Sequence, residues 1–377
     1  MKVLILSCST GGGHNAAAYA LAEQFIKEGH EAQVMDHLKL AGEKVSEEVG
    51  NLYVKSVQTM PSVFGGVYRI GMAVSKKVKH SPIYYANSLV AGQLEEYLKT
   101  HHYDAILMSH LYPAETITCL KRKGLALPLT IAVSTDYTCI PFWEETECDY
   151  LITPHQELIR EYVKRGIPRD RLIGLGIPVS SRFNRKTTRR EARTRLRINQ
   201  TGRMYLVAGG SMGAGDLAKL ASGIYKKIEP GDGMVVICGN NHSLYNKLMS
   251  KYGKRHNVRI VTRTEHMALY MKACDVIFTK PGGLTSTEAA AAGIPIVHTK
   301  PIPGCETENR NFFVSHGMSV SPNSVQAQIL AGVALASRKD KSERMRRAQS
   351  KYGNADAARR IVHFVCRELG TMNHSSQ

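Results

Sequence analysis

The sequence predicts an α/β protein built from two doubly wound domains in tandem. Three observations support this fold class. The chain has 377 residues, which is more than one hydrophobic core usually supports. A glycine-rich loop follows a buried-strand pattern near the N-terminus, and a second glycine-rich loop does the same after residue 204. Because such a loop joins a strand to a helix at the ligand-binding edge of a doubly wound sheet, two loops indicate two domains.

The composition is that of an ordinary globular protein. Hydrophobic residues make up 43% of the chain, and no apolar stretch approaches the roughly 20 residues that span a bilayer. The N-terminal run lacks the cleavage pattern of a signal peptide, so we expect an intracellular protein. The eight cysteines show no metal-ligand spacing and are expected to be reduced.

The charge of the chain predicts an anionic partner, because its formal net charge is +18. Helix-turn-helix, zinc-finger and aromatic-on-sheet patterns are missing from the sequence, so we do not expect nucleic acid. The surface of a membrane rich in anionic lipid is the favoured partner.

The N-terminal residues predict a βαβ unit. Lys2–Ser7 is an apolar strand pattern, and Thr10–His14 is a glycine turn. Apolar residues then recur at helical spacing as far as Gly29, and Glu31–Asp36 forms the next strand.

The same unit formally satisfies a dinucleotide-binding fingerprint. Gly11, Gly13 and Ala16 match G-x-G-x-x-A, and Asp36 follows about twenty residues later. A nicotinamide-dependent oxidoreductase or a non-catalytic nucleotide binder is therefore one alternative. The second glycine loop and the histidine at the tip of the first loop favour a different function.

His14 stands at the start of the first predicted helix. The positive end of the helix dipole favours the neutral imidazole, which is the form in which a histidine acts as a general base. The alternative is a polar loop residue without a chemical role.

Residues 53–92 interleave apolar and aromatic side chains with lysines, such as Phe64 and Tyr68 with Lys76 and Lys79. This mixture suits a membrane interface, where rings lie at the acyl boundary and lysines reach phosphate. The alternative is an insertion that packs on its own domain and exposes a solvated basic edge.

Two further strands of the first half end in polar residues. Tyr103–Met108 leads to His110, and Pro128–Ser134 leads to Asp136. Sites form at the carboxyl ends of parallel strands, so both residues are candidates. Asp136 is either a partner of His14 or a direct base.

A basic stretch separates the two halves. Between Arg182 and Arg203 lie nine Lys or Arg residues and a single acid, Glu191. We expect an interdomain connection and the first helix of the second half. A solvated face is favoured for these charges over contact with membrane or pyrophosphate.

Met204–Ala208 is predicted to open the second doubly wound domain. The loop Gly209–Gly215 follows it and is suited to a diphosphate, with the Ser211 hydroxyl as an added donor. The loop is not a P-loop, because it lacks the G-K-[ST] ending. Strands at Met234–Cys238 and Val258–Val261 continue the domain.

Asp275–Asn309 is the most informative run of the sequence. A short buried strand ends in a turn at Lys280–Gly283, an alanine-rich helix follows and closes at Gly293, and Ile296–His298 forms the next strand. The pattern predicts a strand, turn, helix and strand around a ligand site.

Glu288 has two interpretations. Thr285 and Glu288 have the T-x-x-E spacing of a capping box, which favours a role in starting the helix. Alternatively, the Glu288 carboxylate accepts hydrogen bonds from a vicinal diol such as a ribose. A capping glutamate folds back on its own helix, so the two roles conflict.

The runs GGLTSTEAAAAGIP and PIPGCETEN resemble the donor-sugar signature of family 28 glycosyltransferases. That family includes diacylglycerol glucosyltransferases, plant-type monogalactosyldiacylglycerol synthases and the lipid-linked N-acetylglucosaminyltransferase of peptidoglycan synthesis. The GGGH loop resembles the acceptor-side glycine loop of these enzymes. The resemblance covers nearly the whole chain and implies the GT-B fold, two Rossmann-like domains facing across a cleft.

The resemblance implies a UDP-sugar in the C-terminal half. It places the ribose hydroxyls on Glu288, against the capping interpretation, and the sugar along Glu306, Glu308 and Asn309. The full set of implied donor-binding residues is Gly210, Ser211, Lys280, Gly283, Thr285, Glu288, Glu306, Glu308 and Asn309. The family has a glutamine where this chain has Cys305, so the sugar stays open, with glucose favoured and galactose next.

The resemblance also implies a lipid hydroxyl, that of 1,2-diacylglycerol, in the N-terminal half. His14 or Asp136 would take its proton as it attacks the anomeric carbon, so that configuration inverts. Gly12, Gly13 and His110 would lie on the acceptor side. This chain has Ile140 where the family pattern has a histidine, which leaves the acceptor open to a polyprenyl-linked or other lipid.

No cofactor or metal ion is expected, because no acidic pair with metal spacing accompanies the glycine loops. Helix N-termini and nearby side chains would stabilise the leaving diphosphate instead.

These expectations divide the chain into an acceptor domain at 1–184, a donor domain at 185–354 and a C-terminal segment at 355–377. The basic tail Arg338–Arg367 is predicted to be helical and to cross back to the first domain. We expect a cytoplasmic protein bound peripherally to the inner face of the cell membrane. The sequence does not predict its oligomeric state.

Overall fold

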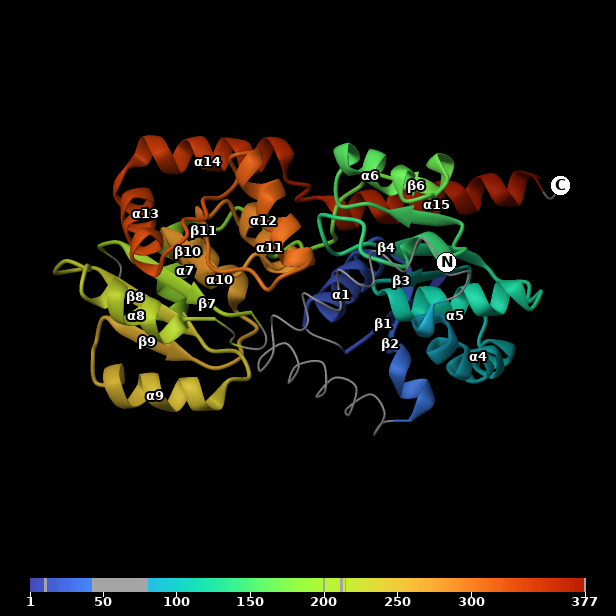
Figure 1. Cartoon of the computed structure of the whole chain (residues 1–377), viewed down its shortest axis with the longest axis horizontal. Coiled ribbons are helices and arrows are strands. Elements are labelled where there is room, and N and C mark those ends of the chain that lie inside the picture. Colours follow the sequence, from blue (N-terminus) through green and yellow to red (C-terminus); the bar gives the residue numbers. More distant parts are fainter. Residues whose placement is uncertain (10–11, 43–80, 199–200, 211–212, 214, 376–377) are drawn as a thin grey trace. The chain divides into compact units, whose positions relative to one another are not determined.

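The computed structural model describes residues 1–9, 12–42, 81–198, 201–210, 213 and 215–375, which form two compact units (Figure 1). The first unit comprises Met1–Ser180, Pro303–Cys305 and Asp356–Gln377, and the second comprises Ser181–Ile302 and Glu306–Ala355. Each unit has its own parallel sheet. The predicted class, α/β with two doubly wound domains, is confirmed.

The first sheet has six strands in the order β2-β1-β3-β4-β5-β6. Its strands are β1 (Lys2–Ser7), β2 (Glu31–Asp36), β3 (Ala105–Met108), β4 (Leu129–Val133), β5 (Tyr150–Ile152) and β6 (Leu172–Ile173). The helices in the described part of this unit are α1 (Gly12–Lys27), α4 (Pro82–Thr100), α5 (Leu111–Arg122), α6 (Ile159–Lys164) and α15 (Ala357–Ser375). Short 3-10 helices are η1 (His37–Ala41), η2 (Trp143–Glu145), η3 (Gln156–Leu158) and η4 (Arg169–Arg171).

The central strands of this sheet are buried on both faces, which is why they are continuous apolar runs rather than alternating ones. In the register, Ile5 of β1 lies between Val34 of β2 and Leu107 of β3. Side chains of α4 and α5 fill one face of the sheet, and those of α1 and α15 fill the other. Figure 1 shows the two helix pairs on these faces.

The second sheet has five strands in the order β11-β10-β7-β8-β9. They are β7 (Met204–Ala208), β8 (Gly233–Ile237), β9 (Val258–Val261), β10 (Val276–Thr279) and β11 (Ile296–His298). Around them lie α7 (Arg189–Leu196), α8 (Leu217–Tyr225), α9 (His242–Tyr252), α10 (Met267–Ala273), α11 (Gly283–Ala292), α12 (Cys305–Ser315), α13 (Val325–Ser337) and α14 (Lys339–Tyr352). The core on one face joins β7, β8 and β10 to α8, α9 and α13.

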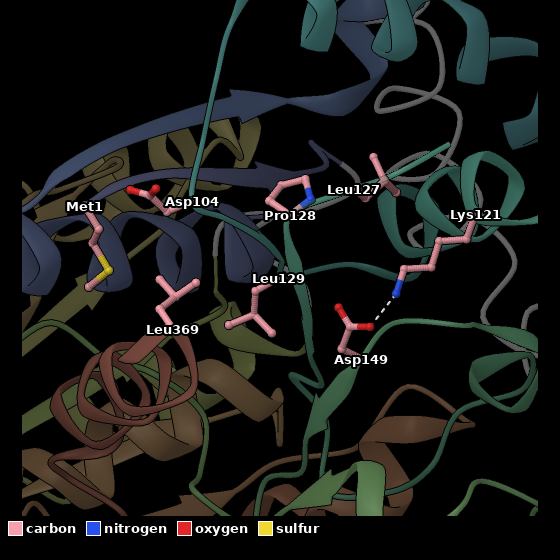
Figure 2. Close-up of a pocket in the computed structure, with 8 residues that line it drawn as sticks. All are labelled: Met1, Asp104, Lys121, Leu127, Pro128, Leu129, Asp149 and Leu369. Carbon is pink, nitrogen blue, oxygen red and sulfur yellow. Dashed lines mark hydrogen bonds and ion pairs between the residues drawn. The ribbon is translucent and has the colours of Figure 1, made fainter. Parts of the chain in front are cut away.

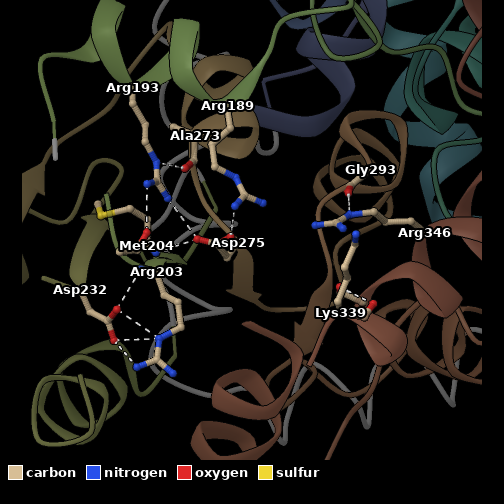
Figure 3. A network of polar contacts seen from close by, with 12 residues as sticks. Arg189, Arg193, Arg203, Met204, Asp232, Ala273, Asp275, Gly293, Lys339 and Arg346 are labelled. Carbon is tan, nitrogen blue, oxygen red and sulfur yellow. Dashed lines mark hydrogen bonds and ion pairs between the residues drawn. The ribbon is translucent and has the colours of Figure 1, made fainter. Parts of the chain in front are cut away.

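The basic stretch around α7 is not wholly solvated (Figure 3). Arg193 is only 2% exposed and donates to Asp275 across 3.1 Å, while Arg189 reaches the other oxygen of that carboxylate at 2.7 Å. Asp275 also accepts from the backbone N–H of Met204 at 2.8 Å. The prediction of a solvated face was wrong for Arg193, because a buried carboxylate before β10 needs charged partners.

The basic tail forms two helices and not one, which corrects the prediction of a helix through Arg338–Arg367. α14 ends at Tyr352, Gly353 is its C-cap, and α15 begins at Ala357. Gly353 lacks the side chain that would stabilise a helix interior. α15 then packs in the first unit, where Glu368 accepts a hydrogen bond from Tyr150 Oη at 2.7 Å.

A cavity of about 580 Å³ in the first unit lies at the amino ends of the strands (Figure 2). Its lining includes Asp104 just before β3, Leu129 at the start of β4 and Asp149 just before β5. Lys121 forms an ion pair with Asp149 at 2.6 Å. Ligand sites in parallel sheets form at the opposite, carboxyl ends, so we assign no catalytic role to this cavity.

Most of the predicted insertion at 53–92 lies outside the described residues, so its membrane role stays a prediction. In its described part, Tyr85 and Leu89 are exposed one turn apart on α4. Among the helices of the described residues, none is long and apolar enough to cross a membrane.

Candidate active site

Both sheets have a topological switch point, where the connections from neighbouring strands run in opposite directions and leave a crevice at the carboxyl ends. In the first sheet this point lies between β1 and β3, and in the second between β7 and β10. His14 and His110 follow the first pair of strands, and Gly210 and Lys280 follow the second pair. The fold therefore brings predicted residues from distant parts of each half to one edge of its sheet.

The His14 ring is held by two oxygens at the first switch point. Its Nδ1 lies 3.0 Å from the carbonyl oxygen of Ser109, at the end of β3, and 3.0 Å from Thr135 Oγ1, after β4. A carbonyl oxygen only accepts, so Nδ1 carries the proton and the lone pair of neutral His14 is on Nε2. This tautomer leaves Nε2 available as a base.

Burial lowers the pKa of His14, and the nearby Asp136 carboxylate and the Ser109 carbonyl only partly offset this. The neutral imidazole expected from the sequence is therefore favoured, but for a different main reason, since desolvation is the largest cause. Asp136 is close enough for its charge to act on the ring, and its role as a partner of His14 stays a prediction.

His110 lies against His14, with the two rings edge to face and 4.4 Å between their centroids. It is the N-cap residue of α5, and its Nδ1 accepts from the backbone N–H of Tyr112 at 3.1 Å. Burial and the neighbouring histidines lower its pKa well below the usual value. Because its Nδ1 lone pair is used in the cap, neutral His110 offers an Nε2–H donor and is not a base at that nitrogen.

The remaining residues predicted for the acceptor side form the start of α1. Gly12 and Gly13 are its first two residues, and His14 stands in its first turn. Asn15 links the start of α1 to the end of β1, since Asn15 Nδ2 donates to Ser9 Oγ at 3.1 Å and Ser7 Oγ donates to Asn15 Oδ1 at 2.5 Å. This local network fixes the helix start that positions His14.

The second switch point is charged. Lys280, directly after β10, forms a short ion pair with Glu306 of α12, and the other oxygen of Glu306 accepts from the backbone N–H of Ile302 at 2.9 Å. The Lys280 side chain crosses Gly210, where an added Cβ would lie 3.3 Å from Lys280 Cε. Gly210 also has a φ of 68°, which favours glycine. Three predicted donor-binding residues are therefore brought together.

The capping-box interpretation of Thr285 and Glu288 is wrong. α11 begins at Gly283 with Gly282 as its N-cap, and no side chain caps it. Thr285 is therefore the third residue of the helix and Glu288 the sixth, which places Glu288 beyond the first four residues, whose N–H groups have no partner within the helix. Burial raises the pKa of Glu288 to about 8.

α11 is tied to the neighbouring strand by a buried histidine that the sequence did not mark. His298 of β11 contacts Ser286 Oγ through Nε2 at 2.9 Å and Ser319 Oγ through Nδ1 at 3.0 Å. Burial lowers the pKa of His298 to about 3, so it is neutral. It serves to position α11, whose free N-terminal N–H groups are suited to an anion.

The other predicted donor residues differ in position. Asn309 is fully buried on α12, whereas Glu308 is exposed and accepts from Asn311 Nδ2 at 3.3 Å. Glu308 therefore does not join the Lys280–Glu306 pair in this structure. Ser211 lies outside the described residues, and Cys305, which departs from the family pattern, is half-buried at the start of α12.

Comparisons with known proteins place both halves among sugar-transferring enzymes. A family model described as monogalactosyldiacylglycerol (MGDG) synthase matches residues 14–179, and one described as glycosyl transferases group 1 matches residues 215–353. The chain is a glycosyltransferase with the GT-B fold. The matches begin at the last residue of each glycine loop and cover most of each half, and they replace the oxidoreductase alternative with a transferase.

Curated relatives of this glycosyltransferase span most of its length. A processive diacylglycerol beta-glucosyltransferase of Bacillus cereus (strain B4264) is 27% identical over 85% of the chain and 81% of its own length. The protein of the same name from Bacillus subtilis (strain 168) is 24% identical over 98% of the chain and 96% of its own length.

Solved structures share the fold of the glycosyltransferase at lower identity. Acinetobacter baumannii MurG aligns with a TM-score of 0.60 and 15% identity, over 97% of this chain and 99% of that one. Anabaena Alr3699/HepE, solved in complex with UDP-glucose, aligns with a TM-score of 0.54 and 13% identity over 100% of both chains. At these identities the likeness concerns the fold alone.

Sequence reasoning missed the residues that orient the candidate groups. Thr135 and Ser109 flank predicted residues, but nothing in the sequence indicated that they would meet His14. The only available signal was that polar residues at the ends of several strands share one sheet edge.

Proposed function

We propose that the enzyme transfers a hexose, with glucose favoured, from a UDP-sugar to the hydroxyl of 1,2-diacylglycerol, with inversion at the anomeric carbon. The product is a beta-glycosyl diacylglycerol, and UDP leaves. The printed names of the curated relatives support both the glucosyl group and the diacylglycerol acceptor.

The observation that carries the proposal is the orientation of His14. With Nδ1–H donated to Ser109 and Thr135, the basic Nε2 is free to accept the proton of the lipid hydroxyl. The hydroxyl oxygen attacks the anomeric carbon as the bond from that carbon to the diphosphate oxygen breaks. Asp136, whose charge raises the pKa of His14, stabilises the imidazolium that forms.

The donor is assigned to the second switch point, between β7 and β10. We propose that its diphosphate competes with Glu306 for the Lys280 ammonium and sits over Gly210. Release from Lys280 leaves the Glu306 carboxylate free to accept hydrogen bonds from sugar hydroxyls. Glu288 would take the ribose diol, and Asn309 would lie along the sugar.

The leaving diphosphate is stabilised, in this proposal, by the α11 N-terminus and Lys280 without a divalent ion. The enzyme works at the cytoplasmic face of the membrane as a peripheral protein, because its acceptor is a lipid. The high positive charge of +18 supports attraction to an anionic surface.

The test is turnover by the purified full chain on diacylglycerol in anionic vesicles, with UDP-glucose and UDP-galactose compared and EDTA present. We expect a lipid-soluble glycoside, more from UDP-glucose than from UDP-galactose. If UDP binds but neither sugar is transferred to diacylglycerol, the acceptor assignment is wrong. If activity appears only when a divalent ion replaces EDTA, the metal-independent step is wrong.

A further inference from the structure

A second basic feature lies in the second unit, away from the donor residues. It is a cavity of about 780 Å³ among α8, α9 and α13. α8 lies beside α13 in the core, and Ser222 of α8 contacts α9 through Tyr252 Oη at 3.2 Å (Figure 1). None of the predicted donor-binding residues lines this cavity. We call it the lysine cavity.

Five exposed lysines line the lysine cavity: Lys219, Lys226, Lys227, Lys247 and Lys251. Lys219 pairs with Asp216 at 3.2 Å, and Lys251 donates to Ser222 Oγ at 3.0 Å. Within the described residues, Lys226, Lys227 and Lys247 have no acidic partner. Their like charges repel one another, so an anion bound among them would lower the electrostatic energy.

The rest of the lining of the lysine cavity includes aliphatic side chains of α13. Leu330 is 51% exposed, and the adjacent Ile329 lies so close to Gly223 that a Cβ there would be 2.2 Å from Ile329 Cδ1. The missing side chain of Gly223 lets α13 approach α8 and set these aliphatic groups beneath the lysines. An occupant therefore needs an anionic group next to an apolar one.

We propose that the lysine cavity binds the phosphate headgroup of an acidic phospholipid and so holds the second unit on an anionic membrane. Lysine stems lie along apolar surface while their ammonium groups reach phosphate, which suits this boundary. Nucleic acid fits less well, because bases are held by stacking on aromatic rings, and an aliphatic lining offers none. The lining contains neither arginine nor an aromatic ring.

This inference rests on the proposed function for the membrane itself, since a lipid acceptor requires the enzyme to work at a bilayer. It adds a contact on the donor-binding unit that is separate from the predicted insertion at 53–92. Membrane attachment of the enzyme would then depend on the acidic lipid content as well as on the acceptor lipid.

The test uses the full chain and vesicles that contain no acceptor or donor. Binding to phosphatidylcholine vesicles is compared with binding to vesicles that also contain phosphatidylglycerol. The variant is Lys226→Ala/Lys227→Ala/Lys247→Ala. The control, Lys339→Ala/Lys341→Ala/Lys351→Ala, removes the same charge from exposed lysines of α14.

Each lysine near an anionic surface contributes about fivefold to binding. We therefore expect the lysine-cavity variant to lose roughly 10- to 100-fold in affinity for the acidic vesicles, beyond any loss in the control. Equal losses in the two variants would mean that net charge alone drives binding, and the cavity assignment would be wrong. An oligonucleotide that binds more tightly than the vesicles, and loses affinity in the same variant, would also overturn it.

A second measurement separates this inference from the proposed function. Turnover of diacylglycerol dispersed in neutral detergent should be the same for the wild type, the variant and the control. If the wild type does not turn over diacylglycerol but binds acidic vesicles through these lysines, the proposed function is refuted and the membrane contact at the lysine cavity is supported. A variant that loses turnover in detergent would show a structural defect and refute the cavity as a membrane contact.

Discussion

The two switch points have the same topology and opposite chemistry. Between β1 and β3, His14 is a neutral ring held by a carbonyl and a hydroxyl, and burial lowers its pKa. Between β7 and β10, a lysine and a glutamate form an ion pair over a glycine. The first arrangement suits proton transfer from a neutral hydroxyl, and the second suits an anion. The topology of the sheet determines where a site can form, and the side chains at that position determine its chemistry.

The largest expected effect separates catalysis from donor binding. His14→Ala should lower kcat by about 10²- to 10⁴-fold, because the general base is lost. UDP affinity should stay within about twofold, since the proposed role of His14 is proton transfer and UDP is assigned to the second switch point. Steady-state kinetics and UDP titration measure the two quantities.

The matched control for that experiment is His363→Ala, which removes an exposed histidine of α15 that pairs with Glu28 at 3.2 Å. It should leave both quantities unchanged. A loss of UDP affinity in His14→Ala as large as its loss of kcat would contradict the assignment of catalysis and donor binding to different switch points.

The converse change should affect the second switch point alone. Lys280→Ala should weaken UDP binding by about 10- to 100-fold, because a charge-assisted contact to the diphosphate is lost. Isothermal titration with UDP measures this loss. Lys254→Ala, at an exposed lysine of the same unit, is the control. Unchanged UDP affinity in Lys280→Ala would place the diphosphate elsewhere.

The pH dependence of donor binding tests Glu288. Its pKa is about 8, so it is mostly protonated at pH 7 and mostly ionised at pH 9. If the carboxylate accepts from the ribose diol, UDP affinity should rise by about tenfold between these values. Glu288→Gln should flatten the profile. A wild-type profile that is equally flat would reject the ribose role.

Glu288 also links the folding stability of the second unit to pH. Its native pKa of about 8 lies above the ordinary value of 4.5, so the native state binds more protons between these pH values. Stability contributed by this group is therefore lost as pH rises through that window. The melting temperature of the wild type should fall more steeply with pH in that window than the melting temperature of Glu288→Gln. Parallel dependences of the two melting temperatures on pH would contradict a raised pKa at Glu288.

The smallest expected effect concerns the orientation of His14. Thr135→Val should lower kcat by about three- to tenfold, because the Ser109 carbonyl still accepts from Nδ1–H when the hydroxyl is gone. Thr135→Ser keeps the hydroxyl and should restore activity. A kcat that falls equally in both variants would indicate a packing defect and not a lost hydrogen bond.

Local patterns predicted much of the fold. The strands β1, β2, β7, β9 and β11 coincide with the predicted runs. Of these, β1, β7 and β11 are short and almost wholly buried, which is the pattern that local sequence predicts best. The helix after the second glycine turn was also predicted, but its start was not. Gly282 serves as the N-cap, and Thr285 lies too far along to cap the helix. The tail was predicted as helical, yet the break at Gly353 was missed.

The sequence by itself determined most strands, the two glycine-loop units and the candidate residues, because these depend on neighbours within a few positions. Tertiary structure decided which groups meet. The Ser109 carbonyl reaches His14 across 95 positions, and Lys280 reaches Glu306 across 26. Parallel sheets place strand ends from distant segments at one edge, and burial there changes the pKa of a histidine or a glutamate. No local pattern carries that information, which is why the partners of His14 and Lys280 were found only in the folded chain.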